Sequence, residues 1–377
     1  MAPSLGATVT GKSLVHQRIV GDKLPTTDAT NNTESSQQTE KLNASNNEAT
    51  HKSTKKQQDE HQQSTLLKRE TTSAATTTLK TIHESGSGEL VWRNIFLFVV
   101  LHSSIPIGIY MMWTQRPYKT MLYALLLTYL SALGVTAGAH RLWSHRSYKA
   151  RWPVQVLLII LQTLAGQNSV YTWSRDHRVH HKFSETDADP HNIKRGFFFA
   201  HMGWLCTRKH PEVLSKGKLI DMSDLEANPY VAFQHKHFWW MAALFTVAVP
   251  TAIPCLMWNE RFWTSFVLSF MFRYALALHG TWLVNSAAHY YGSRPYDEHI
   301  EARESPVVIY TGVGEGFHNY HHAFPSDYST SEFGKYLNIT TAFIDTMASI
   351  GLVYGRRKID AKMILQRRAR TGDLQAS

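Results

Sequence analysis

Cysteine is scarce in this chain, which contains only Cys206 and Cys255 among its 377 residues. Two thiols can form at most one disulfide bond, so a scaffold held together by a disulfide framework is excluded. A metal site built mainly on thiolates would need several cysteines close together. The sequence therefore excludes that kind of site as well.

Apolar residues are sparse over the first 90 positions, where Ser, Thr, Asn, Gln, Lys and Glu dominate. A segment of this composition cannot bury enough apolar surface to offset the entropy lost on folding. It also lacks the apolar core of a signal peptide. From Val91 onward, in contrast, Leu, Ile, Phe, Trp and Tyr are abundant. The sequence therefore predicts a disordered polar tail over residues 1–88 and excludes a single soluble globule.

The first 90 residues carry no excess of positive charge. Their 10 Lys and Arg balance their 10 Asp and Glu, so the whole formal net charge of +10 falls on residues 91–377. Such an excess suggests an anionic membrane surface or an acidic partner protein. Residues 359–377 are predicted to form a basic C-terminal tail.

Four apolar stretches are long enough to cross a bilayer, which takes about 20 helical residues. They cover residues 92–113, 121–139, 238–258 and 262–284. Only a short polar turn separates the members of each pair, so each pair is predicted to form a helical hairpin with its turn on one side of the membrane. The other side carries most of the Lys and Arg, and the positive-inside rule makes it cytosolic. We therefore predict four spans with both chain termini in the cytosol. The alternative, core helices of a soluble protein, is disfavoured by the lengths of these stretches.

Between the two hairpins lie 98 residues that contain one more apolar run, residues 154–164. This run is too short to span a bilayer, and Pro153 and Gly166 bound it. We expect it to lie at the membrane interface.

Nine of the 21 histidines fall in four short segments at or just beyond the ends of the predicted spans. They are His140 and His145 in HRLWSH, His177, His180 and His181 in HRVHH, His289 in NSAAH, and His318, His321 and His322 in HNYHH. Spacings of three and four residues lie on one helical face, so each HxxHH group is expected to aim three imidazoles at a common point. The spacing of five between His140 and His145 does not fit one face of an α-helix. We expect that helix to end or distort between them.

The number of histidines indicates the kind of site. Each histidine alone is most simply a satisfied polar group, but one metal ion takes about four to six ligands, so nine clustered imidazoles indicate two metals. Imidazole suits zinc, copper, iron or nickel, and ligand type alone does not choose among them. A structural zinc site closes with four ligands, so the excess favours a dinuclear redox centre.

The chain resembles the membrane acyl-CoA desaturases of the stearoyl-CoA Δ9 desaturase family over about residues 88–358. The resemblance rests on GAHRLWSHRSY, WSRDHRVHHKFSETDADPHN, GFFFAHMGWL, TWLVNSAAH and GEGFHNYHHAFPSDY. It implies an all-α, four-span enzyme of the endoplasmic reticulum membrane with a cytosolic helical cap, over residues 89–358. The third histidine segment departs from many relatives, which carry Trp where this chain has Phe317 and Ser326.

The implied chemistry is oxidative. The resemblance implies two iron ions that use dioxygen and two electrons to place a cis double bond, at Δ9, in a saturated long-chain fatty acyl-CoA. Removing hydrogen from an unactivated methylene needs a strong oxidant, while the protein supplies ligation, orientation and a dry site. No catalytic residue is therefore expected beyond the metal ligands. The implied donors are cytochrome b5 and its NADH-dependent reductase, and the chain carries no HPGG haem-binding signature of its own. Membrane lipid is an expected partner and nucleic acid is not.

The resemblance also implies roles for individual residues. The nine histidines named above correspond to the iron ligands, and Asn285 to a residue that holds a water on one iron. Gln167, Trp173 and Thr281 would line a bend in the acyl tunnel with Trp282 nearby, and Thr128 and Ala132 would lie toward its far end. The residues that would contact coenzyme A at the mouth are Asn168, Arg175, Asp176, Arg208 and Lys209. For the two tryptophans the alternative is core packing, and for Arg208 and Lys209 it is an ordinary interfacial charge.

Two rival functions remain open on sequence grounds. A hydroxylase of the same histidine-rich membrane class would use the same ligand set. A zinc transporter or zinc sensor would also carry membrane histidines, but transporters place their ligands within the spans near the midplane. Here the histidines lie at the predicted cytosolic ends.

Overall fold

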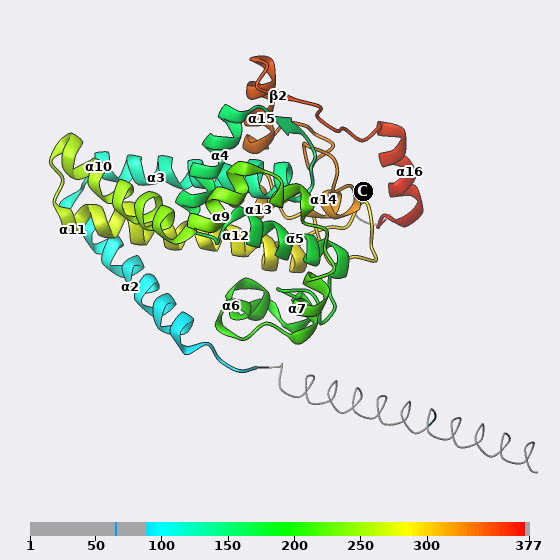
Figure 1. Ribbon diagram of the computed structural model, residues 1–377, viewed down its shortest axis with the longest axis horizontal. Coiled ribbons are helices and arrows are strands. Elements are labelled where there is room, and N and C mark those ends of the chain that lie inside the picture. Colours follow the sequence, from blue (N-terminus) through cyan, green and yellow to red (C-terminus); the bar gives the residue numbers. More distant parts are fainter. Residues whose placement is uncertain (1–64, 66–87, 374–377) are drawn as a thin grey trace, which may run out of the picture. The chain divides into compact units, whose positions relative to one another are not determined.

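The computed structural model describes residues 88–373 together with Thr65, so nearly all of the predicted polar tail lies outside the described residues (Figure 1). The described chain is mostly helical. Its one sheet pairs two strands of two residues each, β1 (Lys149–Ala150) and β2 (Val353–Tyr354), in antiparallel order.

Four helices are long and apolar enough to cross a membrane, which confirms the predicted all-α, four-span architecture. They cover Trp92–Gln115, Tyr118–Ser144, Pro229–Trp258 and Phe262–Tyr290. The second, third and fourth helices extend beyond the predicted apolar ranges at the ends nearest the histidine segments. Helical structure therefore continues past the apolar residues.

Three of the four spans change their helical winding along their length. α2 (Trp92–Gln115) is a continuous α-helix, whereas α3 (Tyr118–Leu133) continues into the π-helix η1 (Gly134–Ser144). The third span consists of α9 (Pro229–Ala242), η4 (Ala243–Ala248) and α10 (Val249–Trp258). The fourth consists of α11 (Phe262–Ser265), η5 (Phe266–Phe272) and α12 (Arg273–Tyr290). Segments η4 and η5 are also π-helical.

The turns of the two hairpins meet at one end of the bundle. Arg116 and Asn259 end α2 and α10 in the left-handed conformation. The hydroxyl of Thr120 donates to Glu260 at 2.5 Å and accepts from the indole of Trp258 at 3.0 Å. Both turns therefore lie on the same side, as the hairpin prediction requires.

The segments outside the spans form short helices around the opposite end of the bundle. They are α4 (Trp152–Ala165), α5 (Val170–Phe183), η2 (Ile193–Arg195), η3 (Phe199–Gly203), α6 (Trp204–Cys206), α7 (Pro211–Gly217), α8 (Ser223–Glu226), α13 (Pro306–Thr311), α14 (His318–Ala323), α15 (Ile339–Ser349) and α16 (Ala361–Thr371).

The apolar run 154–164 forms α4, which packs against α3, η1 and α9. Val154 and Leu158 are fully buried in the largest apolar cluster. Gly134 lets η1 approach α4 at backbone distance, because a Cβ at this position would lie 2.2 Å from the backbone nitrogen of Gln162. An interfacial location of α4 stays a prediction.

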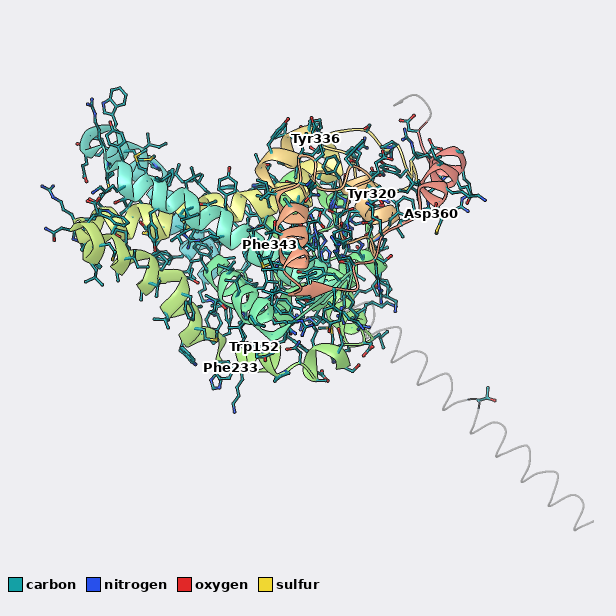
Figure 2. All side chains as sticks on the ribbon, turned by 90° about the horizontal axis from the view of Figure 1, so that it is seen from above. Trp152, Phe233, Tyr320, Tyr336, Phe343 and Asp360 are labelled. Atoms are coloured by element: carbon teal, nitrogen blue, oxygen red, sulfur yellow. The ribbon has the colours of Figure 1, made fainter. Side chains whose placement is uncertain are left out.

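Part of the predicted basic C-terminal tail is the helix α16 (Figure 2). Its Ile364 is buried in a cluster with Tyr296, Tyr320 and Phe324, and its Arg367 pairs with Asp297. These contacts attach α16 to the loop that follows α12.

Candidate metal centre

The first histidine pair lies at the end of the π-helix η1, which contains His140 and ends directly before His145. The backbone N–H of His145 donates to the carbonyl of His140 at 3.1 Å, a bond that spans five residues. A π-turn closes over five residues, whereas an α-turn closes over four. The two rings therefore lie on the same face, with centroids 4.9 Å apart. The helix distorts at this point, as the spacing predicts.

The nine histidines converge in two groups. In the first, the ligand nitrogens of His140, His145, His177, His181 and His321 all lie within 4.8 Å of one another. In the second, the same holds for His180, His289, His318 and His322. Within the groups, Nε2 atoms of neighbouring rings are 2.8–3.3 Å apart. The rings come from η1, α5, α12 and α14.

The expectation that each HxxHH segment aims three imidazoles at one point is wrong. On α5, His177 and His181 join the first group while His180 joins the second. On α14, His318 and His322 join the second group while His321 joins the first. Residues four apart lie on one face of a helix, whereas adjacent residues point in different directions. Each helix therefore contributes to both groups.

Buried carboxylates orient at least one ring in each group. Oε2 of Glu315 lies 3.0 Å from Nδ1 of His140, within ion-pair distance, and Oε1 accepts from the guanidinium of Arg141 at 2.7 Å. Asp189 accepts from Nδ1 of His180 at 2.9 Å. Burial alone would raise the pKa of each carboxyl, but Arg141 and His140 lower the pKa of Glu315 to about 2, and His180 does the same for Asp189. Both acids are therefore ionised, and the Nε2 atoms of the rings they hold point toward the group centres.

Six further imidazole rings of the two groups lie outside the spans and are neutral. Burial, with further contributions from neighbouring imidazoles, holds their pKa values well below the ordinary 6.5; they are His145, His177, His181, His318, His321 and His322. A neutral imidazole has a free lone pair for a cation.

The donor set fits two metal ions. The Nδ1 atoms of His140 and His180 face Glu315 and Asp189, and their Nε2 atoms each lie opposite another ring nitrogen at about the distance found between ligands of one ion. A cation between two such nitrogens would accept a lone pair from each of them. The geometry thus supplies two adjacent sites with nitrogen ligands only, which suit iron, zinc, copper or nickel.

Comparison with known proteins assigns the chain. The fatty acid desaturase family model matches residues 118–343. This chain belongs to that family. It is 55% identical over 285 residues to the stearoyl-CoA desaturase of Sus scrofa, covering 76% of this chain and 79% of the relative. It is 51% identical to two proteins of Acheta domesticus, an acyl-CoA Δ12-desaturase over 295 residues and an acyl-CoA Δ9 desaturase over 286 residues. These matches cover 78% and 76% of this chain and 83% and 80% of the relatives. The predicted family and the oxidoreductase class are confirmed.

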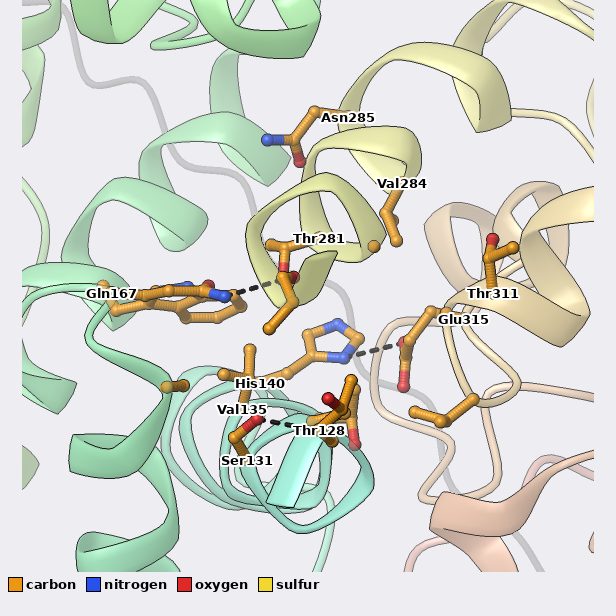
Figure 3. Close-up of a pocket in the computed structure, with 18 of the residues that line it drawn as sticks. Thr128, Ser131, Val135, His140, Gln167, Thr281, Val284, Asn285, Thr311 and Glu315 are labelled. Atoms are coloured by element: carbon orange, nitrogen blue, oxygen red, sulfur yellow. Dashed lines mark hydrogen bonds and ion pairs between the residues drawn. The ribbon is translucent and has the colours of Figure 1, made fainter. Parts of the chain in front are cut away.

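A narrow pocket of this desaturase begins at the histidines and continues between α3 and α12 (Figure 3). Its wall includes Gln167, Trp173 and Thr281, the residues predicted at the bend, and also Thr128 and Ala132, predicted at the far end. The amide of Gln167 donates to the hydroxyl of Thr281 at 2.8 Å across it. Small side chains at one-turn intervals on both helices leave room for a linear apolar ligand.

Asn285 lies one helical turn before His289 and lines the same pocket as His140, His180 and His318. This position is compatible with the predicted contact through a water, which stays a prediction.

The predicted mouth residues divide between two neighbouring pockets. Asn168 and Asp176 line one of them, together with Trp282, which was predicted near the bend, and Arg175, Asp176 and Lys209 line the other. Asp176 accepts from Arg175 at 2.8 Å and also pairs with Lys209. Arg208 lies outside these pockets and pairs with Glu89 at 2.7 Å in an exposed position.

Sequence reasoning missed four residues of the centre. Glu315 and Asp189 contact His140 and His180, Arg141 neutralises Glu315, and His191 lies against His180 with ring centroids 4.3 Å apart. Glu315 precedes His318 by three residues, which is a usable signal in the sequence. The pairing of Arg141 with Glu315 spans 174 positions and has no such signal.

Proposed function

We propose that the protein is an acyl-CoA desaturase that uses two iron ions and one dioxygen to form a cis double bond, at Δ9, in a saturated long-chain fatty acyl-CoA. The observation that carries this proposal is the pocket that connects both histidine groups to a channel lined by small residues. The balanced reaction converts two adjacent methylenes, one O2, two electrons and two protons into one double bond and two waters. The relatives named Δ9 and Δ12 are equally similar to this chain, so the Δ9 position rests on the resemblance in the histidine segments.

The nine histidines would hold the two ions, with Asn285 contacting one of them through a water. Bound iron supplies the oxidising power by reacting with dioxygen once it is reduced. The buried Glu315 and Asp189 would keep the imidazoles of His140 and His180 oriented. No general acid or nucleophile is required from the protein.

The channel residues would fix the reacting carbons. Gln167 and Thr281, joined by a hydrogen bond across the pocket, would force the acyl chain to bend, and Trp173 stacks on the ligand His177 with ring centroids 4.9 Å apart. Holding two methylenes in a fixed position beside the ions is what selects one bond of many identical ones. At the mouth, Arg175 and Lys209 suit the phosphates of coenzyme A.

The electrons would come from cytochrome b5 and its NADH-dependent reductase, and the enzyme would reside in the endoplasmic reticulum membrane with the histidine end and both termini in the cytosol. The net charge of +10 supports an acidic donor. The concentration of cations at the histidine end of the bundle supports this orientation.

The test is lipid analysis of cells that lack their own desaturase and express this chain. An unsaturated fatty acid with its double bond at carbon 9 is expected, and its chain length reports the substrate preference. A double bond elsewhere would contradict only the Δ9 assignment. A hydroxylated product would instead support the second candidate, a hydroxylase, which the same ligand set permits.

Metal analysis of the purified protein tests the cofactor. About two irons per chain are expected. Zinc together with a complete lack of oxidase activity would support a zinc sensor instead. Zinc alone would be ambiguous because it can replace iron during overexpression.

A further inference from the structure

Two segments about 200 residues apart form one surface beside the first histidine group. The β1–β2 pairing aligns Lys149 with Tyr354 and Ala150 with Val353. Beyond the strands, the backbone N–H of Arg151 donates to the carbonyl of Leu352, and that of Arg357 donates to the carbonyl of Ser147, both at 2.9 Å. We call the exposed face of residues 146–151 and 351–358 the basic ladder.

The basic ladder gathers six exposed cations: Arg146, Lys149, Arg151, Arg356, Arg357 and Lys358. Three of them have acidic partners, since Arg146 pairs with Asp224, Arg356 with Asp345 and Lys358 with Asp327. Among the described residues, no carboxylate lies within ion-pair distance of Lys149, Arg151 or Arg357. The side chain of Arg151 donates only to the carbonyl of Gly351, at 2.9 Å. The surface therefore keeps three positive charges that nothing in the described chain neutralises.

Few covalent bonds and hydrogen bonds separate the basic ladder from the metal centre. Ser147 follows the ligand His145 by two residues, a separation of at most about 7 Å along the chain. Its buried hydroxyl donates at 2.9 Å to the carbonyl of Arg141, which directly follows the ligand His140. Because the backbone of Arg357 bonds to Ser147, the outer edge of the basic ladder lies one hydrogen bond and two residues from a ligand.

We propose that the basic ladder is the docking surface for the acidic electron-carrying protein that reduces the two ions. The proposal rests on the proposed function and identifies where its two electrons enter. Each turnover needs two electrons from outside to reduce one O2 to two waters, with two hydrogens taken from the substrate and two protons from solvent. Electron transfer weakens steeply with distance, so a donor must bind where the route to the ions is short.

The composition of the surface fits a transient protein partner. Unpaired cations steer an acidic protein toward the site and raise its rate of encounter, an effect that salt screens. Tyr354, half exposed at the centre of the ladder, offers the aromatic contact that protein interfaces favour. An anionic bilayer could also attract these cations, but it would not need a surface next to a metal ligand.

The test compares two charge reversals of equal size in purified enzyme reconstituted in phosphatidylcholine vesicles. The ladder variant is Lys149→Glu with Arg357→Glu, and the control is Lys335→Glu with Lys362→Glu, which changes two exposed lysines elsewhere. The measurement is the rate at which reduced soluble cytochrome b5 is oxidised during desaturation, as a function of its concentration and of salt. We expect the ladder variant to raise the KM for the donor at least tenfold at low salt, to lose most of its salt dependence and to keep its maximal rate. The control is expected to stay within twofold of the unchanged enzyme.

A single turnover driven by dithionite, without the donor, separates the possible failures. If the unchanged enzyme gives no unsaturated product with dithionite or donor, the proposed function fails. If it gives product and the ladder variant keeps a normal KM for the donor, the docking surface is wrong. A defect that appears only in vesicles containing phosphatidylserine would overturn the proposal in favour of lipid contact. If the charge-reversed ladder variant gives no product with dithionite, the variant Lys149→Gln with Arg357→Gln replaces it. We then expect a threefold rise in the KM for the donor. An unchanged KM for the donor would contradict the proposal.

Discussion

At the scale of single residues, Glu315 has the most demanding environment in the metal centre. It is 5% exposed and contacts both His140 and the fully buried Arg141. A buried pair of this kind contributes little net stability as a pair, but removing one partner leaves the other charge uncompensated. Glu315 therefore connects the stability of the fold with the orientation of a ligand.

We expect Glu315→Gln to lower the free energy of unfolding by about 3–5 kcal/mol and the metal affinity by about 10–100-fold. The lowered pKa of Glu315 stabilises the fold fully above its unfolded value of 4.5, and this contribution is lost as the pH falls toward about 2. Denaturant unfolding in detergent between pH 6 and pH 3 measures the effect. The variant should lose that part of the acid sensitivity, whereas the exposed control Glu298→Gln should behave like the unchanged protein.

Replacing one histidine of each group tests the ligand assignment. We expect His180→Ala and His321→Ala each to abolish turnover and to lower the iron content, while membrane insertion is largely retained. Iron analysis and product analysis of purified variants provide the measurement. His299→Ala, an exposed histidine outside the groups, is the control. Full activity in either ligand variant would contradict the site.

At the scale of elements, the π-helical segments explain how polar residues enter an apolar bundle. In η1 the π-turn brings His140 and His145 onto one face. Near η5, the buried Arg273 donates to the carbonyl of Ser269 at 2.9 Å and to that of Leu164, at the end of α4, at 3.3 Å. Helix ends and π-turns leave carbonyls that need donors. The arginine is therefore held by backbone groups rather than by an acid.

The contact between η1 and α4 depends on Gly134. We therefore expect Gly134→Ala to lower the stability of the protein and Gly217→Ala to leave it nearly unchanged. Gly134→Ala would place a Cβ against the backbone of α4, so we expect a loss of about 1–3 kcal/mol of stability. In Gly217→Ala the new Cβ would be 3.7 Å from its nearest neighbour, and little change is expected. Thermal unfolding in detergent compares the two. Equal stabilities would show that η1 and α4 can separate without cost.

A row of three histidines also connects elements and was not anticipated from the sequence. Nε2 of His102 on α2 lies 3.1 Å from His279 on α12, whose other nitrogen lies 3.0 Å from His201 on η3. The three rings surround the buried Trp282. They attach α2 to the wall of the pocket that Asn168, Asp176 and Trp282 line.

At the scale of the whole molecule, the histidine groups join elements from different apolar clusters, because η1 and α5 share the largest cluster whereas α12 and α14 contribute to others. The histidines come from the end of the second span, from α5, from the end of the fourth span and from α14. The proposed ions would hold these elements together. A ligand that binds only the folded state stabilises it by about 2.7 kcal/mol at 100 times its Kd.

We therefore expect chelation of iron to lower the melting temperature of the reconstituted protein. The measurement is thermal unfolding with and without an iron chelator. The variant that combines His180→Ala with His321→Ala should melt at a lower temperature and respond little to the chelator. An equal response in both proteins would show that the ions do not stabilise the fold.

The amino-acid sequence by itself determined the four spans, the common side of the two hairpin turns and the membership of nine histidines in one centre. Apolar runs of membrane length and short histidine spacings are local properties that need no knowledge of packing. Only the tertiary structure decided which histidine joins which group, because neighbouring residues on α5 and α14 point to different sides and the complementary rings come from other elements. Likewise, the hydrogen-bond partners of His140, Arg141 and Ser147 lie more than 170 positions away along the chain. Only folding brings these residues close together.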